Sequence, residues 1–418
     1  MRILHLTTEF PPVIYGGLGT AVGGWVNASA NAGVDVAVQL VEGPLVLGAG
    51  SHAYGGLRRP PMARSSSVSR QDGVTFFQCS WLNAIDTGIR LVREWHADIV
   101  HLHTAMLWYV AQAIQAATAT PIVYHVHSVD RAEYEIGQEP NPWLAHSQAQ
   151  EQAIDQSDRL IALTRSEEKL LSLYYPHARH KVRVVGNGID DSAMTRRAAF
   201  DKPRGIQTVV LYSGRLVERK GIRELLAAIP EVLRSEPNVL FVIVGGPPPL
   251  TGDEVKAQWL GAEHAPFAMH VQFTGWQSPV NVAKWYEAAD ILVAPSRYEP
   301  FGMVILEGML YGLAVLAADV GGPSEILEHG RTGLLFPACD VRALSSALLW
   351  LIEHPVERQD IGRAGAHRIR ERWLWKGKVP AMLSVYQELV SPRAAGLVAD
   401  GEARQRVGEH AHDGLAGA

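Results

Sequence analysis

Two carboxylates, Glu299 and Glu307, lie eight positions apart in the stretch "RYEPFGMVILEG". The apolar run "ILVAPS" before them predicts a strand, and "MVILEGMLYG" predicts a helix that ends at Gly312. Glu299 would then precede the helix, and Glu307 would lie inside it. The amides of residues 301–304 have no partner within such a helix, so they can bind an anion. The carboxylates can accept hydrogen bonds from hydroxyl groups on either side of that anion, which suits a sugar joined to a ribose through a diphosphate.

A second stretch, "YSGRLVERKGI", places two cations directly after an apolar run. Arg215 and Lys220 lie between Gly214 and Gly221. Ligands of doubly wound folds bind at the carboxyl ends of parallel strands, and a guanidinium with an ammonium suits a diphosphate. On this stretch alone, a solvated basic turn is the alternative interpretation.

A third stretch, "TTEFPPVIYGGLGTAVGGW", is rich in glycine at the start of a predicted helix. Gly16, Gly17 and Gly19 follow the first predicted strand, where backbone N–H groups could approach a ligand closely. A Gly-rich turn after the first strand also occurs where a chain merely turns a corner, and that alternative stays open.

The elements that position these stretches are short apolar runs that alternate with helical segments. In the first half, helices are predicted at residues 17–31, 84–96, 105–117 and 142–156. Strand-like runs occupy residues 2–7, 35–41, 74–78, 98–103, 121–127, 159–164, 181–185, 208–214, 239–246, 271–275, 291–296, 314–320 and 333–337. The alternation predicts an α/β fold in which parallel sheets are covered by helices on both faces. Two such blocks predict two doubly wound, Rossmann-like domains.

Length and composition agree with two domains. The 418 residues suit two domains of about 200 residues each, with 47% hydrophobic and 19% charged residues. The net charge of −5 predicts no nucleic-acid partner. Cys79 and Cys339 fit neither a disulfide framework nor a zinc site, which predicts reduced thiols in a cytoplasmic protein. No apolar run reaches the roughly 18 residues of a membrane span, and the first apolar stretch is too short for a signal peptide.

The domain boundary is predicted at "VVGNGID", residues 184–190, where the apolar rhythm stops. The first domain would comprise residues 1–187 and the second residues 188–373. Residues 44–72 are rich in Gly, Pro, Ser and Arg and are predicted to form a long irregular loop. The tail from 391 to 418 lacks apolar periodicity and is predicted to be disordered.

Together these stretches resemble a known family. The stretch "EPFGMVILEG" is similar to the E-x7-E motif of retaining glycosyltransferases of family four, nucleotide-sugar-dependent enzymes with the GT-B fold. The stretch "SGRLVERKG" resembles that family's phosphate-binding turn, and "VVGNGID" its interdomain sequence. The stretch "EFPPVIYGGLG" is similar to the Gly-rich loop that the family shares with glycogen and starch synthases. The matches follow the family order over residues 1–390, and the resemblance implies a GT-B fold whose two domains face a central cleft. It also implies that a C-terminal helix at about 374–390 packs back on the first domain.

The resemblance implies a role for each matching residue of the second domain. Glu299 would contact the donor sugar near its reacting face, and Glu307 would bind the ribose hydroxyls. Arg215 and Lys220 would neutralise the diphosphate. Further donor contacts are implied for Phe301, Gly302 and Met303 through their backbone and for Trp276 near the base.

In the first domain, the resemblance implies that Gly17 closes over the phosphate and that His127 of "VYHVHSVD" touches the donor sugar. His125 shares the strand face of His127, and a core position is the favoured interpretation for it. His101, His103, Asp130 and Glu133 follow strand ends and could meet an acceptor, although a structural role is the commoner one for such residues. Glu325 of "GGPSEI" is interpreted as a helix-capping carboxylate.

The resemblance implies transfer of a sugar, most simply from a uridine diphosphate sugar, to a hydroxyl acceptor with retention of configuration. No carboxylate is marked as a nucleophile, which favours front-side displacement. The cations and helix amides predict a reaction without a metal or other cofactor. The acceptor stays open among a small molecule, a saccharide and a lipid-linked compound. Peripheral contact with the inner face of a membrane is a possibility at residues 57–64 and 169–183, where basic and apolar residues mix.

Three other functions stay open on the sequence. A glucan synthase is suggested by "YGGLG", although this loop lacks the lysine typical of glycogen synthases. A sugar-nucleotide 2-epimerase would share the GT-B fold but lack the E-x7-E motif and the Arg–Lys pair. A silent nucleotide-sugar-binding protein is the third, and the presence of every motif residue argues against it.

Overall fold

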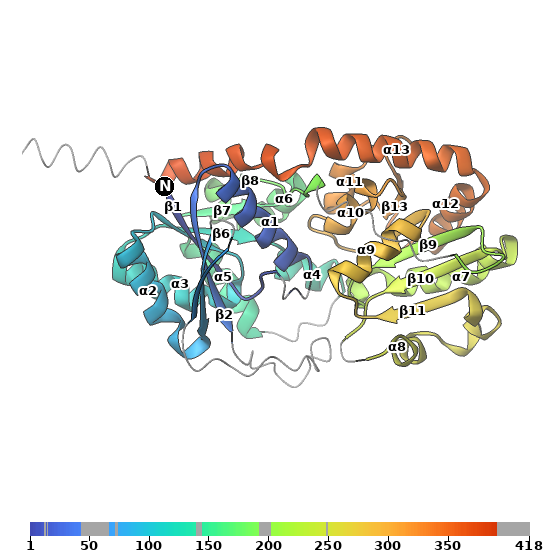
Figure 1. Cartoon of the computed structure of the whole chain (residues 1–418), viewed down its shortest axis with the longest axis horizontal. Helices are drawn as coiled ribbons and strands as arrows, with labels where there is room; N and C mark the ends of the chain where they lie inside the picture. Colours follow the sequence, from blue (N-terminus) through green and yellow to red (C-terminus); the bar gives the residue numbers. More distant parts are fainter. Residues whose placement is uncertain are drawn as a thin grey trace, which may run out of the picture.

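The computed structural model has two parallel sheets, each flanked by helices, with the C-terminal segment lying along both halves (Figure 1). The structure describes residues 1–11, 14, 16–42, 67–71, 74–138, 144–191, 202–247 and 250–390. This arrangement confirms the predicted α/β fold with two Rossmann-like sheets.

The first sheet has eight strands in the order β3-β4-β2-β1-β5-β6-β7-β8. All neighbours in it are parallel except β3 and β4, which are antiparallel. Its strands are β1 (Arg2–Thr7), β2 (Asp35–Glu42), β3 (Ser67–Gln71), β4 (Val74–Ser80), β5 (Ile99–Leu102), β6 (Ile122–Val126), β7 (Arg159–Ala162) and β8 (Val182–Val184). Its helices are α1 (Gly17–Asn31), α2 (Ala84–Trp95), α3 (Trp108–Thr118), α4 (Asp130–Glu135), α5 (Leu144–Gln156) and α6 (Arg165–Tyr174).

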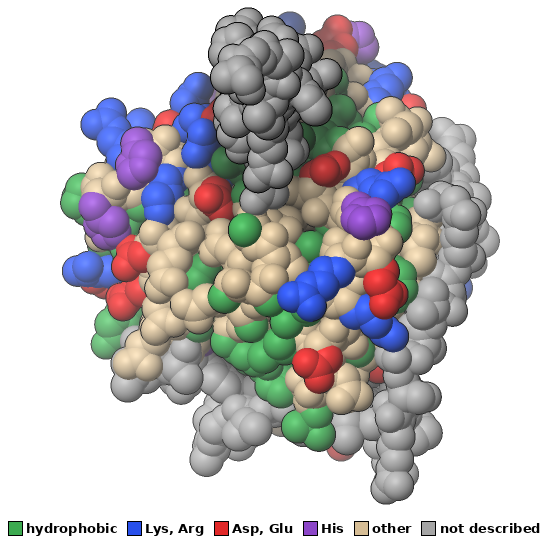
Figure 2. All heavy atoms as spheres, turned by 90° about the vertical axis from the view of Figure 1, so that its left-hand side faces the viewer, with side chains coloured by type: hydrophobic (Ala, Val, Ile, Leu, Met, Phe, Trp, Pro, Cys, Tyr) green, Lys and Arg blue, Asp and Glu red, His purple; other side chains and the backbone are tan. Residues whose placement is uncertain are grey.

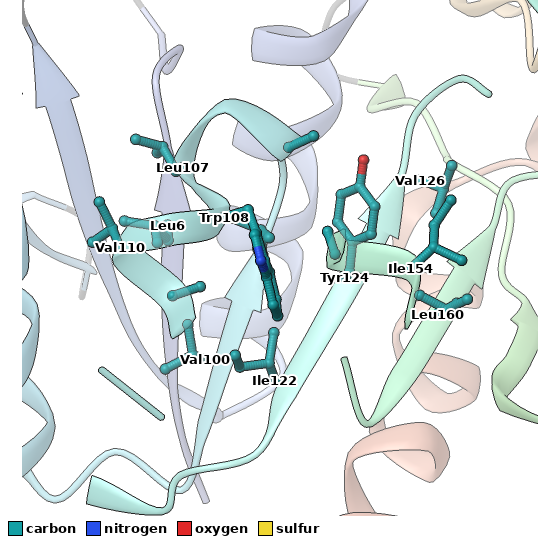
Figure 3. Packing of buried hydrophobic residues seen from close by; sticks show 14 of the residues in the cluster. Leu6, Val100, Leu107, Trp108, Val110, Ile122, Tyr124, Val126, Ile154 and Leu160 are labelled. Carbon is teal, nitrogen blue, oxygen red and sulfur yellow. The ribbon is translucent and has the colours of Figure 1, made fainter. Parts of the chain in front are cut away.

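One face of this sheet packs against α2, α3 and α5. Figure 3 shows that Trp108 and Tyr124 lie among aliphatic side chains from β1, β5, β6, β7 and neighbouring helices. The residues that each strand contributes to this cluster occupy alternate positions, because successive side chains of a strand point to opposite faces. β6 is buried along its whole length, as expected for a central parallel strand covered on both sides.

The second sheet has six parallel strands in the order β11-β10-β9-β12-β13-β14. Its strands are β9 (Thr208–Ser213), β10 (Val239–Val244), β11 (Val271–Gly275), β12 (Ile291–Ala294), β13 (Ala314–Ala318) and β14 (Leu334–Phe336). Its helices are α7 (Ile222–Ser235), α8 (Gly252–Trp259), α9 (Pro279–Ala288), α10 (Met303–Leu310), α11 (Gly321–Ile326), α12 (Val341–Glu353) and α13 (Pro355–Arg372). The chain order reverses beside β9, the first strand of this sheet, where β10 and β12 lie on opposite sides of it. Such a reversal is the usual ligand site of doubly wound folds.

The chain crosses between the two sheets twice, and the crossings lie side by side. The Ile189 N–H donates to the Trp373 carbonyl at 2.8 Å, and the Trp375 N–H donates to the Ile189 carbonyl at 3.3 Å. Beyond this point residues 379–390 form a helix, drawn in red, that lies over the first sheet (Figure 1). Tyr386 of this helix and Trp25 of α1 belong to the core on the second face of the first sheet.

The structure differs from the sequence prediction in the segment 44–72. Residues Ser67–Gln71 form β3, which pairs with β4 in antiparallel register. An edge strand of mixed polar residues has no continuous apolar run, so periodicity did not reveal it. The rest of that segment up to residue 66, and the tail from residue 391, lie outside the described residues.

Surface features bear on two of the predicted partners. Figure 2 shows one end face, where described Lys and Arg side chains are interspersed with Asp and Glu instead of forming a continuous basic field. Of the two predicted membrane-contact segments, residues 57–64 lie outside the described residues. In the other, Arg183 bonds to Glu388 at 2.9 Å, although Leu173 is 70% exposed. No helix within the described residues has the length and apolar character needed to span a membrane.

Candidate active site

The E-x7-E stretch lies where the sequence predicts, at the carboxyl end of a central strand. β12 ends at Ala294, and α10 begins at Met303. Glu299 lies in the loop between them with 6% of its surface exposed, and Glu307 lies within α10. Gly302 precedes α10 with a φ of 98°, a conformation that side-chain-bearing residues rarely adopt. Because Gly302 has no side chain that could cap α10, the first amides of this helix are available to a ligand.

Glu299 forms a buried ion pair with Lys220, which connects the loop after β12 with the turn after β9. The Ser296 hydroxyl donates to the same carboxylate oxygen at 3.2 Å. Burial would raise the pKa of Glu299, but Lys220, Arg219 and the hydrogen bonds together lower it below its usual range. Glu299 is therefore an anion held in place by a cation, and both charged groups belong to the second domain.

Glu307 has a different environment from Glu299. The Tyr286 hydroxyl of α9 donates to a Glu307 carboxylate oxygen at 2.7 Å. Burial raises the pKa of Glu307, and the hydrogen bond from Tyr286 only partly offsets this effect. Within the described residues no cation pairs with Glu307, so its carboxylate is a good acceptor for ligand hydroxyl groups.

The second Gly-rich turn, Gly321–Gly322, packs against the backbone of the loop that contains Glu299. The Gly322 N–H donates to the Glu299 carbonyl at 2.9 Å. A Cβ at Gly322 would lie 1.8 Å from the Phe301 carbonyl oxygen, so no larger residue fits there. The two glycines therefore allow close packing of the backbones that fixes the position of Glu299.

The turn after β9 carries three cations, and the first domain contributes an anion to them. Arg219 donates to Glu133 of α4 at 3.1 Å and is 5% exposed. Burial would raise the pKa of Glu133, but Arg219, Arg215 and Lys220 together lower it. Arg215 and Lys220 thus lie near each other as predicted. Glu133 has an ionic role in joining the two domains, which agrees with the structural interpretation.

The first domain presents the start of α1 to the start of α10. A Cβ on Gly17 would lie 3.7 Å from the Met303 side chain, so the two helix N-termini approach each other across the domain interface. Gly16 precedes α1 and has no side chain, so this residue supplies no cap to the first amides of the helix. This convergence concentrates positive dipole ends at one place.

His127 follows β6 and is the half-buried member of a larger group of histidines. Its Nε2 lies 3.2 Å from Nδ1 of His103. Burial lowers the pKa of His127 to about 3, so its ring is neutral at physiological pH. His125 is fully buried and stacks on His127 with ring centroids 4.4 Å apart, which confirms its predicted core position.

Tyr298 connects the two domains directly beside Glu299, a role that the sequence did not reveal. Its hydroxyl donates to Glu167 of α6 at 2.8 Å and accepts from the Val129 N–H at 3.1 Å. Val129 lies two residues after His127. The position of Tyr298 directly before the motif was a usable signal, whereas nothing in the sequence around Glu167 marked that residue.

Glu325 caps a helix, but the helix belongs to the other domain. Its carboxylate accepts from the Arg165 N–H at 3.0 Å and from the Ser166 N–H at 2.8 Å. These are the first amides of α6, whereas Glu325 lies in α11. The neighbouring Thr164 hydroxyl donates to the Pro300 carbonyl at 3.2 Å, which adds a further contact between the domains.

The remaining predicted residues differ in their burial and in their contacts. Phe301 is buried, and its ring lies 5.7 Å from that of Trp373 between centroids. Trp276 follows β11 at the edge of the second sheet and is 40% exposed. Asp130 bonds to His146 at 2.5 Å and to Gln150 at 3.1 Å, which supports the structural interpretation of this carboxylate.

Comparison with known protein families matches both halves of the chain. Residues 15–193 match the model described as Glycosyltransferase Family 4, and residues 197–368 match the model described as Glycosyl transferases group 1. A D-inositol 3-phosphate glycosyltransferase of Jonesia denitrificans is 32% identical over 69% of this chain and 71% of its own. A glycogen synthase of Mycobacterium tuberculosis is 27% identical over 92% of this chain and 94% of its own.

Solved structures show the same architecture. Sucrose-phosphate synthase from Thermosynechococcus elongatus aligns with a TM-score of 0.74 at 20% identity, covering 94% of this chain and 100% of that one. The Anabaena protein HepE, in complex with UDP-glucose, aligns with a TM-score of 0.66 at 20% identity over the same shares. The chain is therefore a glycosyltransferase with the GT-B fold that belongs to glycosyltransferase family 4.

Proposed function

We propose that this enzyme transfers a sugar from a uridine diphosphate sugar to a hydroxyl acceptor, with retention of configuration at the anomeric carbon and without a metal ion. The observation that carries the proposal is the buried pair of Lys220 and Glu299 beside the N-terminus of α10. A cation, a carboxylate and unpaired helix amides at one point match the charge and hydroxyl pattern of a sugar diphosphate.

The donor would lie along α10, mainly on the second domain. Its diphosphate would accept hydrogen bonds from Lys220, Arg215 and the amides of Gly302 and Met303. The ribose hydroxyls would donate to Glu307, whose carboxylate forms no ion pair within the described residues. From the first domain, Gly17 would approach the phosphate through the amides at the start of α1.

The sugar would lie between Glu299 and His127, one residue from each domain. Trp276, at the end of β11, would lie toward the base. The domain contacts through Tyr298, Glu133 and Glu325 hold the two halves of this site together. Enclosure of the donor in this way would limit its hydrolysis by water.

The transfer step breaks one bond and forms another on the same face of the sugar. The bond between the anomeric carbon and the diphosphate oxygen breaks, and a bond from that carbon to the acceptor oxygen forms. The proton of the acceptor hydroxyl moves to the departing phosphate oxygen. Retention therefore needs no enzyme nucleophile, and the protein stabilises the negative charge that develops on the diphosphate.

The same residues support the proposed independence from metal ions. Lys220, Arg215 and the N-termini of two helices supply the positive charge that a divalent cation would supply in a metal-dependent enzyme. We therefore expect transfer to continue in excess EDTA at an unchanged rate.

The relatives suggest which nucleotide sugar and which acceptors to assay first. HepE, with the same fold, was solved with UDP-glucose, which makes UDP-glucose the first donor to test. An elongating glucan synthase is the second candidate, because similarity to a glycogen synthase extends over 92% of this chain. Inositol phosphate is another acceptor to test because of the similarity to inositol phosphate glycosyltransferases.

The test is release of nucleoside diphosphate from a panel of UDP-, ADP- and GDP-sugars, with glycogen, inositol phosphate or no acceptor present. Acceptor-dependent release of UDP, together with a product of unchanged anomeric configuration, supports the proposal. Chain extension of glycogen would favour the glucan synthase instead. Inversion of configuration, or complete loss of transfer in EDTA with recovery on adding magnesium, would contradict the proposed mechanism.

A further inference from the structure

Five histidines lie together on one face of the first sheet. His5 of β1 pairs in register with His101 of β5, while His103 follows β5, His125 lies in β6 and His127 follows β6. The ring centroids of His101 and His103 are 4.2 Å apart, and those of His125 and His127 are 4.4 Å apart. His127 is the half-buried member of this group, and the other four are buried.

Three of these histidines form a continuous hydrogen-bonded chain. Nδ1 of His5 lies 2.9 Å from Nε2 of His103, and Nδ1 of His103 lies 3.2 Å from Nε2 of His127. Burial lowers the pKa of both His5 and His127 to about 3 and that of His103 well below its usual range. Each ring is therefore neutral and carries one proton, so all hydrogen bonds of the chain must point in the same direction.

The end of the chain at His5 decides this direction. Its Nε2 is buried and has no hydrogen-bond partner among the described residues. If the bonds ran from His127 to His5, this nitrogen would carry a buried N–H without a partner. If they run from His5 to His127, the same nitrogen is an acceptor, and buried acceptors without partners are less rare than buried donors without partners.

We propose that His5 and His103 hold His127 as the tautomer protonated on Nδ1, so that it presents a hydrogen-bond donor to the substrate. His5 Nδ1–H donates to His103 Nε2, and His103 Nδ1–H donates to His127 Nε2. Nδ1–H is then the group of His127 that remains for a sugar hydroxyl or a phosphate oxygen. His5 and His103 are positioning residues, since they act through His127.

The consequence for catalysis rests on the proposed function, whereas the tautomer does not. A neutral donor at this position can stabilise an oxygen that gains negative charge, without holding a proton that the departing phosphate would compete for. The imidazoles also form two groups, His5–His101–His103 and His103–His125–His127, in which one nitrogen from each ring lies within 4.8 Å of the others. At this spacing each group could bind a metal ion. Metal binding by these groups would use nitrogens of the chain, so the two arrangements exclude each other.

Long-range proton–nitrogen NMR of protein labelled with 15N-histidine measures the tautomer directly, with the His127 signal assigned from a His127→Gln sample. We expect a protonated Nδ1 and an unprotonated Nε2 at pH 8. In His103→Phe, which keeps an aromatic ring, His127 should lose this preference and populate both tautomers. The turnover number should fall about tenfold, with a smaller change in the donor KM.

His125→Phe is the matched control, because His125 is equally buried and stacks on His127, yet neither of its nitrogens has a partner among the described residues. It should leave the His127 tautomer and the turnover number unchanged. At the other end of the chain, His5→Asn keeps an N–H donor and should preserve the tautomer, whereas His5→Phe should disturb it.

Three results would overturn the proposal: an Nε2–H tautomer in the wild-type protein, the same tautomer populations in His103→Phe as in wild type, or a stoichiometric metal that is lost in His5→Phe. An inactive protein with the expected tautomer pattern would contradict the proposed function alone, because the NMR measurement does not depend on turnover.

Discussion

The Tyr298 hydroxyl donates to the Glu167 carboxylate at 2.8 Å, across the interface between the two domains. It also accepts from the Val129 N–H at 3.1 Å, so one phenol bonds to two elements of the first domain. Since Tyr298 precedes Glu299 and Val129 follows His127 by two residues, these bonds set the distance between the two sides of the proposed sugar site. The structure therefore shows the two domains in contact around the site.

Removal of this contact should weaken both stability and turnover. In Tyr298→Phe, two buried hydrogen bonds are lost and the Val129 N–H and Glu167 lose a partner, at a cost of about 1–3 kcal/mol. We expect a lower melting temperature and a reduced turnover number. Tyr134→Phe, at a tyrosine that is 49% exposed, is the control and should change neither. Equal melting temperatures for Tyr298→Phe and wild type would mean that the contact does not form in solution.

Glu167 should make stability depend on pH. Burial is the largest cause that raises its pKa, from 4.5 to about 7. The folded protein therefore holds a proton that the unfolded chain has lost between these values, and the free energy of unfolding should fall as pH rises from about 4.5 to about 7. The fall is at most ~3 kcal/mol, from 1.36 kcal/mol per pKa unit.

Glu167→Gln should remove this dependence, because glutamine does not ionise and its amide oxygen can still accept from Tyr298. Melting temperatures across pH 5 to 8 provide the measurement. The difference between variant and wild type should grow in favour of the variant toward pH 8. A constant difference over the whole range would contradict the shifted pKa.

Lys220 should be needed for turnover because it neutralises the donor diphosphate. In Lys220→Met, the charge-assisted contact is lost and Glu299 becomes a buried carboxylate without its cation. We expect the turnover number to fall at least about tenfold, and Arg215→Met to act in the same direction. Arg223→Met is the control, because that side chain is 65% exposed and pairs with Glu218. Undiminished transfer by Lys220→Met would show that Lys220 does not bind the donor diphosphate.

Glu307 should act mainly on donor binding. Glu307→Gln keeps the shape but weakens the acceptor for the ribose hydroxyls, so the donor KM should rise more than the turnover number falls. Because protonation has the same effect, the KM should also rise as the pH is lowered through the pKa of Glu307. Tyr286→Phe removes the hydrogen bond that lowers this pKa, so that rise should begin at a higher pH. A larger effect of Glu307→Gln on turnover than on KM would contradict the assignment.

Domain closure should depend on Glu325. Its carboxylate caps α6 of the other domain, so Glu325→Ala should favour a more open arrangement. Small-angle scattering should give a larger radius of gyration than for wild type, and saturating UDP should reduce the difference because a donor contacting both domains favours closure. Glu353→Ala, at an exposed position, serves as the control. An unchanged radius of gyration for Glu325→Ala, with and without UDP, would contradict a hinge that this contact controls.

Much of the fold could be predicted because the spacing of apolar residues along the chain indicates where strands and helices lie. Buried parallel strands are continuous apolar runs, and the predicted helix at residues 17–31 has the bounds of α1. β3 could not be predicted in this way, since an edge strand needs no apolar run. The E-x7-E stretch was predictable because a strand end, a glycine and a helix start fix the positions of Glu299 and Glu307 locally.

The contacts between the domains were the part that sequence reasoning missed. Glu167 and Tyr298 are 131 positions apart, and the cap of α6 by Glu325 joins residues 159 and 160 positions apart. No local pattern encodes such pairs, because each depends on how two separately folded sheets meet. The chain from His5 through His103 to His127 likewise requires the order of β1, β5 and β6 in the sheet, which spacing along the sequence does not give.

A crystal structure of the protein with UDP tests the central claim most directly. We predict that the diphosphate lies within hydrogen-bonding distance of Lys220 and of the amides of Gly302 and Met303. The ribose hydroxyls should donate to Glu307. UDP bound elsewhere, or bound here with its ribose turned away from Glu307 and its diphosphate away from Lys220, would contradict the proposed site.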